Sequence, residues 1–330
     1  MSATPPAGSA SLKLARSNRQ SDSRKRADRV GDLSLRLICT AAAVLAAIVL
    51  ILIAKEVIEG AQPAFAKYGL SFITHEEWAP PLEVFGGKGL ILGTLITSAM
   101  ALAIGAPVAI SIAIFLALLA PDGVRNVVSP LVEMLAAVPS VILGFWGLLI
   151  LGPFLAGTVE PFLHEWLGFI PLFGTPQTTG ASIFNAGLIL TIMVIPIIAS
   201  VSRDLFMAVP SDLQDGAAAL GSTRWEVIRG VVLPTTLSGM LAACLLGLGR
   251  ALGEAIAVSQ VVGGGTESHI SLFRNGGTMA SLIALQFPSA ISALHYASLY
   301  YLAALLLVIG VAANLAASYV GHRFGGAPAR

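Results

Sequence analysis

Long apolar runs separated by short polar connections dominate the pattern of this chain. Each run approaches or exceeds the ~20 residues that a helix needs to cross a bilayer. They lie at about 33–54, 89–120, 127–156, 181–202, 235–262 and 296–320. The pattern predicts an all-α membrane protein with six transmembrane helices, and an even number of spans places both termini on one side.

Composition supports this class of protein. Hydrophobic residues make up 56% of the chain and charged residues 11%, whereas an average soluble domain has roughly 25% charged residues. Lipid is therefore expected to be the principal solvent.

Basic residues indicate the orientation. The first 36 residues carry Lys13, Arg16, Arg19, Arg24, Lys25, Arg26, Arg29 and Arg36. Because cytoplasmic segments are enriched in Lys and Arg, both termini are expected in the cytoplasm. Residues 1–32 lack apolar periodicity and are predicted to be a disordered cytoplasmic arm rather than a nucleic-acid-binding segment. The predicted first transmembrane helix covers 33–58, and 321–330 form a cytoplasmic tail.

A polar island at residues 209–234 separates the fourth and fifth runs. The Ser211 and Asp212 pair suits a helix N-cap, and Ser222 with Thr223 offers a second cap after Gly221. Two short helices with a glycine elbow are predicted. Since Arg203, Arg224 and Arg229 lie in this connection, it is expected to face the cytoplasm.

One ionisable pair lies inside an apolar run. Arg250 and Glu254 are four residues apart, so a continuous helix places them on one face. A lone Arg at mid-span costs roughly 2.5 to 3.5 kcal/mol on insertion scales, so the two side chains should face the bundle interior and each other. Two interpretations stay open: an ion pair that only fixes helix register, or an Arg that binds a passing oxyanion while Glu254 holds the guanidinium between passages.

The island resembles the cytoplasmic loop of bacterial ABC importer permeases. Gly221 is followed after nine residues by Val231, Leu233 and Pro234, and Asp215, Gly216 and Ala217 stand where the family has Glu-Ala-Ala. In that family the loop docks on an ATP-hydrolysing subunit. The resemblance assigns coupling to Asp212, Asp215, Gly216, Ala217, Gly221, Ser222, Arg224 and Trp225. The alternative is an amphipathic hairpin with no partner.

Four further segments resemble phosphate-specific permeases of the PstC type and together cover most of residues 85–320. They are FGGKGLILGTLITSAMALAIGAPVAISIAIFLA, VEMLAAVPSVILGFWGL, GLGRALGEAIAV and SALHYASLYYLAALLLVI. The resemblance implies a MetI-like permease core with an extra N-terminal helix. It also implies a second permease of the PstA type, two ATPase subunits of the PstB type and an external phosphate-binding protein of the PstS type. It places phosphate passage on Arg250 and Glu254, with Glu133 as a further candidate.

The chain has no P-loop, zinc-protease or nucleophile-elbow motif, so we expect no catalysis, metal or cofactor in it, with ATP and Mg on the partner ATPase. Three alternatives remain: a permease for another oxyanion such as sulfate or molybdate, a secondary anion carrier or channel, and a membrane-embedded enzyme.

The connection at 263–295 contains an apolar stretch, 278–292, that is short for a span. It is expected at the outer surface or as a re-entrant segment, forming with 55–88 a platform for a binding protein. The alternative is a helix that only closes the bundle.

Overall fold

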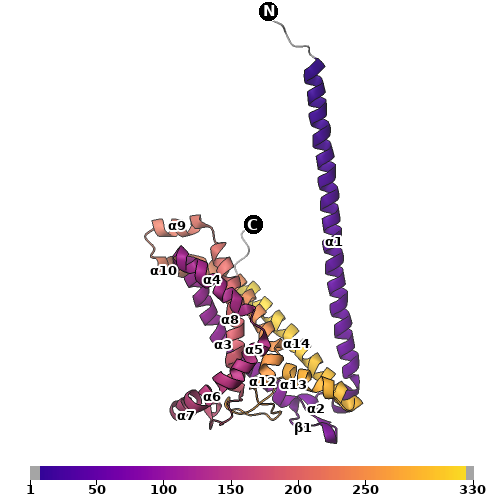
Figure 1. Cartoon of the computed structure of the whole chain (residues 1–330), viewed down its shortest axis with the longest axis vertical. Coiled ribbons are helices and arrows are strands. Elements are labelled where there is room, and N and C mark those ends of the chain that lie inside the picture. Colours follow the sequence, from indigo (N-terminus) through magenta and orange to yellow (C-terminus); the bar gives the residue numbers. More distant parts are fainter. Residues whose placement is uncertain (1–7, 325–330) are drawn as a thin grey trace, which may run out of the picture. The chain divides into compact units, whose positions relative to one another are not determined.

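The computed structural model describes residues 8–324, with side chains from residue 31 onward except those of 317 and 320–324. The chain forms two compact units, residues 1–56 and 57–330. Within the described residues, six helices are long and apolar enough to cross a membrane. They cover Gly31–Tyr68, Lys88–Leu119, Ser140–Leu167, Ile183–Met207, Arg224–Gly253 and Ala293–Ala316. The predicted all-α class with six spans is confirmed (Figure 1).

Helix α1 covers Gly8–Tyr68 and makes up the described part of the first unit. It includes residues 8–32, where the sequence led us to expect disorder, whereas residues 1–7 lie outside the described part. The helix can extend this far back because Ala, Leu, Arg, Lys and Gln are good helix formers and its first proline is Pro63. The apolar span also continues past the predicted end at residue 58.

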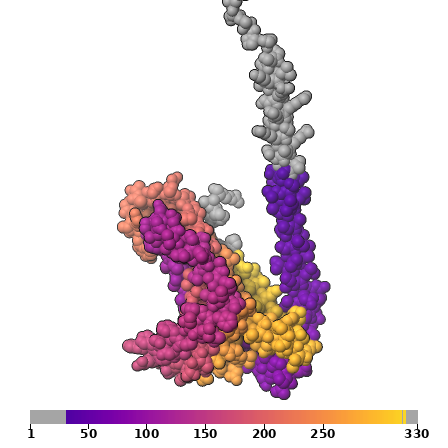
Figure 2. All heavy atoms as spheres, in the orientation of Figure 1, coloured from indigo at the N-terminus to yellow at the C-terminus, as the bar shows by residue number. Residues whose placement is uncertain are grey.

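The two ends of the second unit are built differently. At one end, α9 (Ser211–Ala219) and α10 (Arg224–Val227) protrude, as Figure 2 shows in space-filling form. The other end carries short elements and a small antiparallel hairpin (Figure 1). These are α2 (Ser71–Thr74), β1 (Trp78–Ala79), η1 (Pro80–Leu82), β2 (Val84–Phe85), η5 (Pro171–Phe173), α13 (Met279–Gln286) and η7 (Phe287–Ser289). We call these the loop end and the hairpin end.

The second and third spans differ from prediction at their junction. The second is α3 (Lys88–Ile114) continued by a π-helical turn, η2 (Phe115–Leu119). The third was expected at 127–156, which is wrong at its start, because α4 (Asp122–Ala136) is a separate amphipathic helix. Pro139 disfavours helical backbone at the residue before it, so α4 ends upstream, and Pro139 itself occupies the N-cap position of α5. The spanning helix then consists of α5 (Ser140–Trp146), η3 (Gly147–Leu151), α6 (Gly152–Phe154), η4 (Leu155–Val159) and α7 (Glu160–Leu167).

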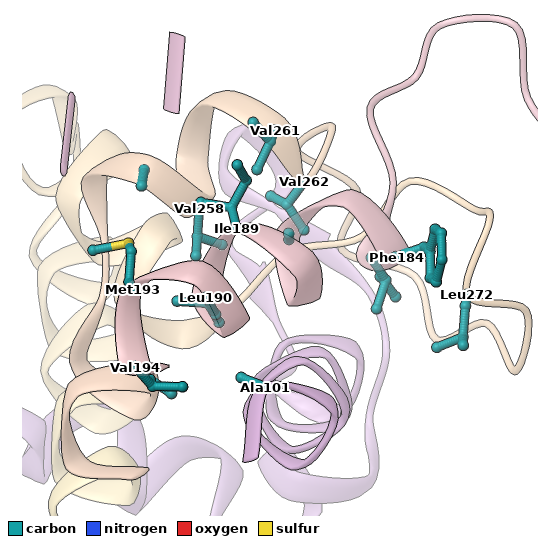
Figure 3. Close-up of a cluster of buried hydrophobic side chains, with 14 of the residues drawn as sticks. Ala101, Phe184, Ile189, Leu190, Met193, Val194, Val258, Val261, Val262 and Leu272 are labelled. Carbon is teal, nitrogen blue, oxygen red and sulfur yellow. The ribbon is translucent and has the colours of Figure 1, made fainter. Parts of the chain in front are cut away.

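Helix α8 (Ile183–Met207) is the centre of the second unit. Its most apolar stretch is 72% buried, against 17–28% in the other spans of this unit. Ile189, Leu190 and Val194 of α8 pack with Val258 and Val261 in the main core (Figure 3). Helix α8 is therefore the scaffold against which the elements of the site are placed.

Small residues allow the neighbouring helices to approach α8 closely. A Cβ at Gly105 of α3 would come within 2.8 Å of Val194, and one at Gly247 would come within 2.8 Å of Ile198. Such close approach is how helices pack in lipid, where the hydrophobic effect does not drive their association.

The fifth span begins earlier and ends earlier than the predicted 235–262. It consists of α10, the π-helical turn η6 (Ile228–Val232) and α11 (Leu233–Gly253). A separate helix, α12 (Ile256–Val261), follows the break. The sixth span lies in α14 (Ala293–Phe324). This helix includes residues 321–324 of the predicted tail, 321–330, and the rest of the tail lies outside the described part.

The apolar stretch at 278–292 is too short to span, as predicted, and forms α13 and η7. Met279 is fully buried with Phe72, Phe85 and Leu302 in a second core at the hairpin end. The indole Nε1 of Trp78 donates to Gln286 Oε1 at 2.8 Å, which joins the hairpin to α13. The stretch therefore closes the bundle at this end.

Candidate functional site

The charged pair predicted inside the membrane is formed. Arg250 Nη2 lies 3.4 Å from Glu254 Oε2. The two residues are not on one face of a continuous helix, however, because α11 ends at Gly253 and Glu254 has extended backbone, with φ −73° and ψ 117°. The prediction of a shared helix face is thus wrong, although the prediction of a pair is confirmed.

Glu254 has a second role at the helix break. Its Oε1 accepts a hydrogen bond from the backbone N–H of Ala257, at 3.2 Å, in the first turn of α12. A helix start leaves N–H groups without helical acceptors, and a carboxylate near them is favourable. The side chain therefore joins the end of α11 to the start of α12.

The two members of the pair differ in exposure. The Glu254 side chain is 7% exposed and the Arg250 side chain 44% exposed. Glu254 is held by two partners and lies in the interior, as predicted, whereas the Arg250 side chain is only partly buried within this chain. A Cβ at the neighbouring Gly249 or Gly253 would meet no atom within 4 Å. A guanidinium offers five donors, so Arg250 can contact Glu254 and still bind an oxyanion.

A mostly apolar groove lies beside Gly249, the neighbour of Arg250 in the sequence. The groove has a volume of about 330 Å³ and lies between α11 and α14, and its lining includes Leu246, Leu252 and the polar Asn314 but not Arg250 itself. The Leu246 side chain is exposed on the same face. An Arg on an apolar helix face is costly against lipid, so this face requires a polar or protein neighbour.

Glu133 is not part of this cluster. It lies on α4 and pairs with Arg203 of α8 at 2.9 Å. The residue before α8, Ser182, donates its backbone N–H to Val261 at the end of α12. Arg203 lies about 20 residues further along α8, or ~30 Å at 1.5 Å per residue. Glu133 is thus near the loop end, far from Arg250.

The polar island forms the two predicted helices with a glycine elbow. Gly221 has φ +90°, a left-handed conformation that favours glycine. Thr223 then caps α10 in a reciprocal capping box with Glu226. Ser222 does not serve as this cap, and the Ser211 and Asp212 cap is wrong as well, because Pro210 occupies the N-cap of α9 without a side-chain bond.

Most of the residues assigned to coupling are exposed. Asp212, Asp215, Gly216, Gly221, Arg224 and Trp225 are exposed, and Ala217 and Ser222 are partly so. A Cβ at Gly216 or Gly221 would meet no atom within 4 Å. This surface is therefore free to meet a partner.

Large apolar side chains on this loop were missed by sequence reasoning. Leu220 is 90% exposed and Leu213 is 51% exposed, and Trp225, which was predicted, is 61% exposed. These three side chains leave apolar surface uncovered on an otherwise polar loop. The signal was available in the sequence as Leu and Trp within a polar island.

The loop is anchored firmly at its base. Val209 and Val232 are buried with Phe206, Ala113 and Met240, which come from α8, α3 and α11. Movement of the loop would therefore be transmitted to three membrane helices.

The turn between η2 and α4, also at the loop end, is fixed by hydrogen bonds from Arg125. The Arg125 guanidinium donates to the carbonyls of Leu116 and Ala117 at 2.8 and 2.9 Å. A cation is favourable at a helix C-terminus, where carbonyls lack helical donors.

A hollow of about 250 Å³ separates the loop from the end of the second span. Asp215, Ser222 and Arg224 line it together with Leu118 and Leu119. Three of the eight predicted coupling residues therefore line a concave surface beside the protruding helices.

Among the residues that the structure describes, no group of His, Cys, Asp and Glu side chains could hold a metal ion. Cys39 and Cys244 are free cysteines in different spans.

A bundle of membrane helices, a charged pair at a helix break and a protruding polar loop define a polytopic membrane protein. Residues 109–326 match the family described as binding-protein-dependent transport system inner membrane component. The chain belongs to this family and is a multi-pass inner-membrane protein.

Relatives that cover most of the chain are permeases. The phosphate transport system permease protein PstC of Pasteurella multocida (strain Pm70) is 45% identical over 255 residues, covering 76% of this chain and 79% of the relative. The probable phosphate transport system permease protein PstC of Methanocaldococcus jannaschii is 36% identical, covering 80% and 85%. These relatives are transport components rather than enzymes, which confirms the prediction that this chain is a transport subunit without catalytic activity.

Solved structures show the same fold. A bacterial alginate ABC transporter in complex with alginate pentasaccharide-bound periplasmic protein contains a chain with TM-score 0.59 and 21% identity, covering 86% of this chain and 94% of that chain. An inward-facing MetNI methionine ABC transporter gives TM-score 0.51 at 18% identity, covering 75% and 99%. The predicted MetI-like ABC permease fold is confirmed.

Proposed function

We propose that this chain is the transmembrane permease subunit of an ATP-driven importer of inorganic phosphate. The observation that carries the proposal is 45% identity over 255 residues to a phosphate transport system permease. The exposed guanidinium of Arg250 supports the same substrate, because Arg matches the geometry of phosphate oxygens.

The substrate path follows the outward face of α11. Arg250 binds phosphate there, and Glu254 retains the guanidinium when phosphate has left. Because Glu254 is fixed by the N–H of Ala257, it returns Arg250 to one position after each passage. A negative neighbour also weakens phosphate binding, which favours release toward the cytoplasm.

A second permease of the PstA type covers this face and completes the path. The half-exposed Arg250 and the apolar groove beside it support this, because a single chain would expose the cation to lipid. The remaining partners are an external phosphate-binding protein of the PstS type and two copies of an ATPase of the PstB type, which holds ATP and Mg.

The loop of α9 and α10 docks on that ATPase. ATP binding moves the loop, and the buried base passes the movement to α3, α8 and α11. The helices thereby alternate between outward and inward access. Asp215, Gly221, Arg224 and Trp225 form the centre of the contact, with Leu213 and Leu220 as additional apolar anchors.

The loop end is cytoplasmic, so both termini lie in the cytoplasm. Arg125, Arg203, Arg224 and Arg229 gather at this end, in agreement with the excess of basic residues on cytoplasmic loops. The hairpin end then faces outward and meets the binding protein.

Purification of the intact complex from native membranes tests the proposal. We expect a second permease and an ATPase to copurify with this chain, and the complex to accumulate phosphate in preference to sulfate or molybdate. Preferential uptake of another oxyanion would refute the substrate assignment. A complex that contains no ATPase would refute the importer itself.

A further inference from the structure

A polar hollow lies at the hairpin end, outside the site described above. Its volume is about 400 Å³, and it is lined by Gln177, Gly264, Gly265, Thr266, His269 and Arg274, among others. We call it the outer pocket.

The outer pocket is directly connected to the charged pair through α12. Glu254 caps the start of α12, and the other end of the helix leads into Gly263. Gly276 N donates to Val262 O at 2.9 Å, and Gly263 bridges to Gly276. These contacts hold together the two segments that line the pocket, at the end of α12. Because α12 has six residues, it is about 9 Å long.

Arg274 is an unpaired cation in this pocket. In the described part of the chain its guanidinium makes no hydrogen bond or ion pair with another residue. Other cations at the hairpin end are engaged: Lys67 Nζ donates to Glu83 O at 3.3 Å, and Lys88 pairs with Glu76. The N–H donors of the Arg274 guanidinium are thus free to bind an external anion.

The remaining charges do not neutralise Arg274. Glu267 also lines the pocket, but its carboxylate is 3.3 Å from His269 Nε2 and its side chain is 78% exposed. Glu76, which lies nearby, accepts from Ser268 and Lys88. Both carboxylates have partners other than Arg274.

One backbone donor adds to the guanidinium. The N–H of Gly265 donates to no acceptor among the described residues, whereas the N–H of Gly264 faces Gly276 O in the bridge between the two segments. Gly264 has φ +74°, and a Cβ there would meet nothing within 4 Å, so the backbone is accessible. Glycine permits close approach of a ligand to the backbone.

We propose that the outer pocket holds a hydrated inorganic oxyanion after the binding protein releases it and before it reaches Arg250. The proposal rests on the proposed importer function and names an earlier station on its path. A water molecule occupies about 30 Å³ of liquid, so the pocket has room for an oxyanion with several waters. Retained hydration makes binding weak, and a path site must release its ion as readily as it takes it.

The test uses the full complex reconstituted in vesicles with its copurified partners and loaded binding protein. Arg274→Gln should lower the maximal ATP-driven phosphate uptake rate about tenfold, the effect of losing one charge-assisted hydrogen bond. Affinity of the binding protein for the complex should not change. Arg274→Lys should retain most of the rate, and Lys67→Gln is the matched control because it removes an external cation from outside the pocket.

Charge can also be restored after assembly. In a background with Cys39→Ala and Cys244→Ala, Arg274→Cys should be slow until a cationic thiosulfonate modifies it, and an anionic thiosulfonate should give no recovery. Because the complex is already assembled, folding does not enter this comparison.

Two results would overturn the proposal. One is uptake by Arg274→Gln at the wild-type rate. The other is weaker docking of the binding protein with an unchanged rate at saturation, which would assign Arg274 to a protein-docking surface. Wild-type complex that accumulates no phosphate would instead refute the proposed function. If it accumulates another oxyanion, the same variants are measured with that anion.

Discussion

At the scale of residues, the two charges of the membrane pair have different environments. Glu254 is buried and has two partners, whereas Arg250 is half-exposed and has one. The sequence predicted the pair from its four-residue spacing. It could not show the asymmetry, because that arises from the end of α11 at Gly253, and a glycine within an apolar run does not by itself end a helix.

Arg250→Ala should reduce phosphate uptake at least about tenfold, because it removes a charge-assisted bond to the substrate worth about 1.5–3 kcal/mol. Uptake by reconstituted vesicles measures the effect, and copurification of the partners checks assembly. Arg250→Lys is the control for charge and should retain part of the rate, since Lys binds phosphate without the bidentate geometry. Uptake by Arg250→Ala at the wild-type rate would remove Arg250 from the path.

Glu76 should make the hairpin end sensitive to acid. Hydrogen bonds from Lys88 and Ser268 hold the pKa of Glu76 below its ordinary value of 4.5. The folded state therefore binds this proton less readily than the unfolded state. The resulting stabilisation is present above the unfolded-state pKa and is lost as pH falls through the folded-state pKa.

Hydrogen exchange of residues 263–270 at pH 3 to 7 measures this effect. Protection of these amides, expressed as the exchange rate relative to the intrinsic rate at the same pH, should fall at the acid end in the wild type, and this fall should be smaller in Glu76→Gln. An identical pH profile in the two proteins would show that Glu76 does not hold this loop.

At the scale of elements, the island of α9 and α10 was the most predictable part of the site. The spacing around Gly221 predicted two helices and an elbow, and the structure has both, with φ +90° at the elbow. The assignment of the caps was less successful. Ser, Thr and Asp all suit an N-cap, and the choice among neighbouring candidates depends on the chain direction at the helix start.

Gly221→Val should disrupt docking of the ATPase. A β-branched residue at positive φ costs about 1–3 kcal/mol and would redirect α10 relative to α9. Copurification and ATP-driven uptake should both fall. Gly123→Ala is the matched control: a Cβ there also meets no atom within 4 Å, but the residue lies within α4, outside the coupling residues, where Ala is favoured over Gly by about 1 kcal/mol. Normal docking by Gly221→Val would contradict the docking assignment.

Leu220→Ser should weaken ATPase binding without loss of folding, because this side chain is 90% exposed and contributes little to the core. Burying one Leu against a partner contributes about 1.5–3 kcal/mol, so affinity should fall by at least about tenfold. The loss is measured as the change in the dissociation constant between the detergent-solubilised permease and the ATPase. Phe169→Ser, another exposed apolar residue at 82%, lies at the hairpin end and should leave the affinity unchanged. Equal losses from the two substitutions would indicate a general effect on the protein.

At the scale of the whole molecule, hydrophobic runs were sufficient to predict six spans, and the structure has six. The boundaries of the third and fifth spans were wrong for a common reason. Apolar composition continues across Val138 and Pro139, and across Gly253 and Glu254, while the helices end there. Composition reports the solvent around a segment, whereas Pro and Gly determine whether its backbone continues as a helix.

The outer pocket could not be predicted from the sequence, because it is formed by a contact between two irregular segments. Gly263 and Gly276 lie 13 residues apart in a connection without regular structure between them, and their bridge brings Arg274 beside Gly264 and Gly265. No periodicity in the connection indicates such a pairing. The loop and the charged pair, in contrast, could be recognised because each is encoded within a short segment.

Uptake of radiolabelled phosphate by vesicles containing the purified complex tests the central claim most directly. The account predicts accumulation against a phosphate gradient only when ATP and the ATPase subunit are present, and no accumulation by this chain alone. Accumulation by the chain alone, driven by an ion gradient or a voltage and unaffected by ATP, would contradict the account.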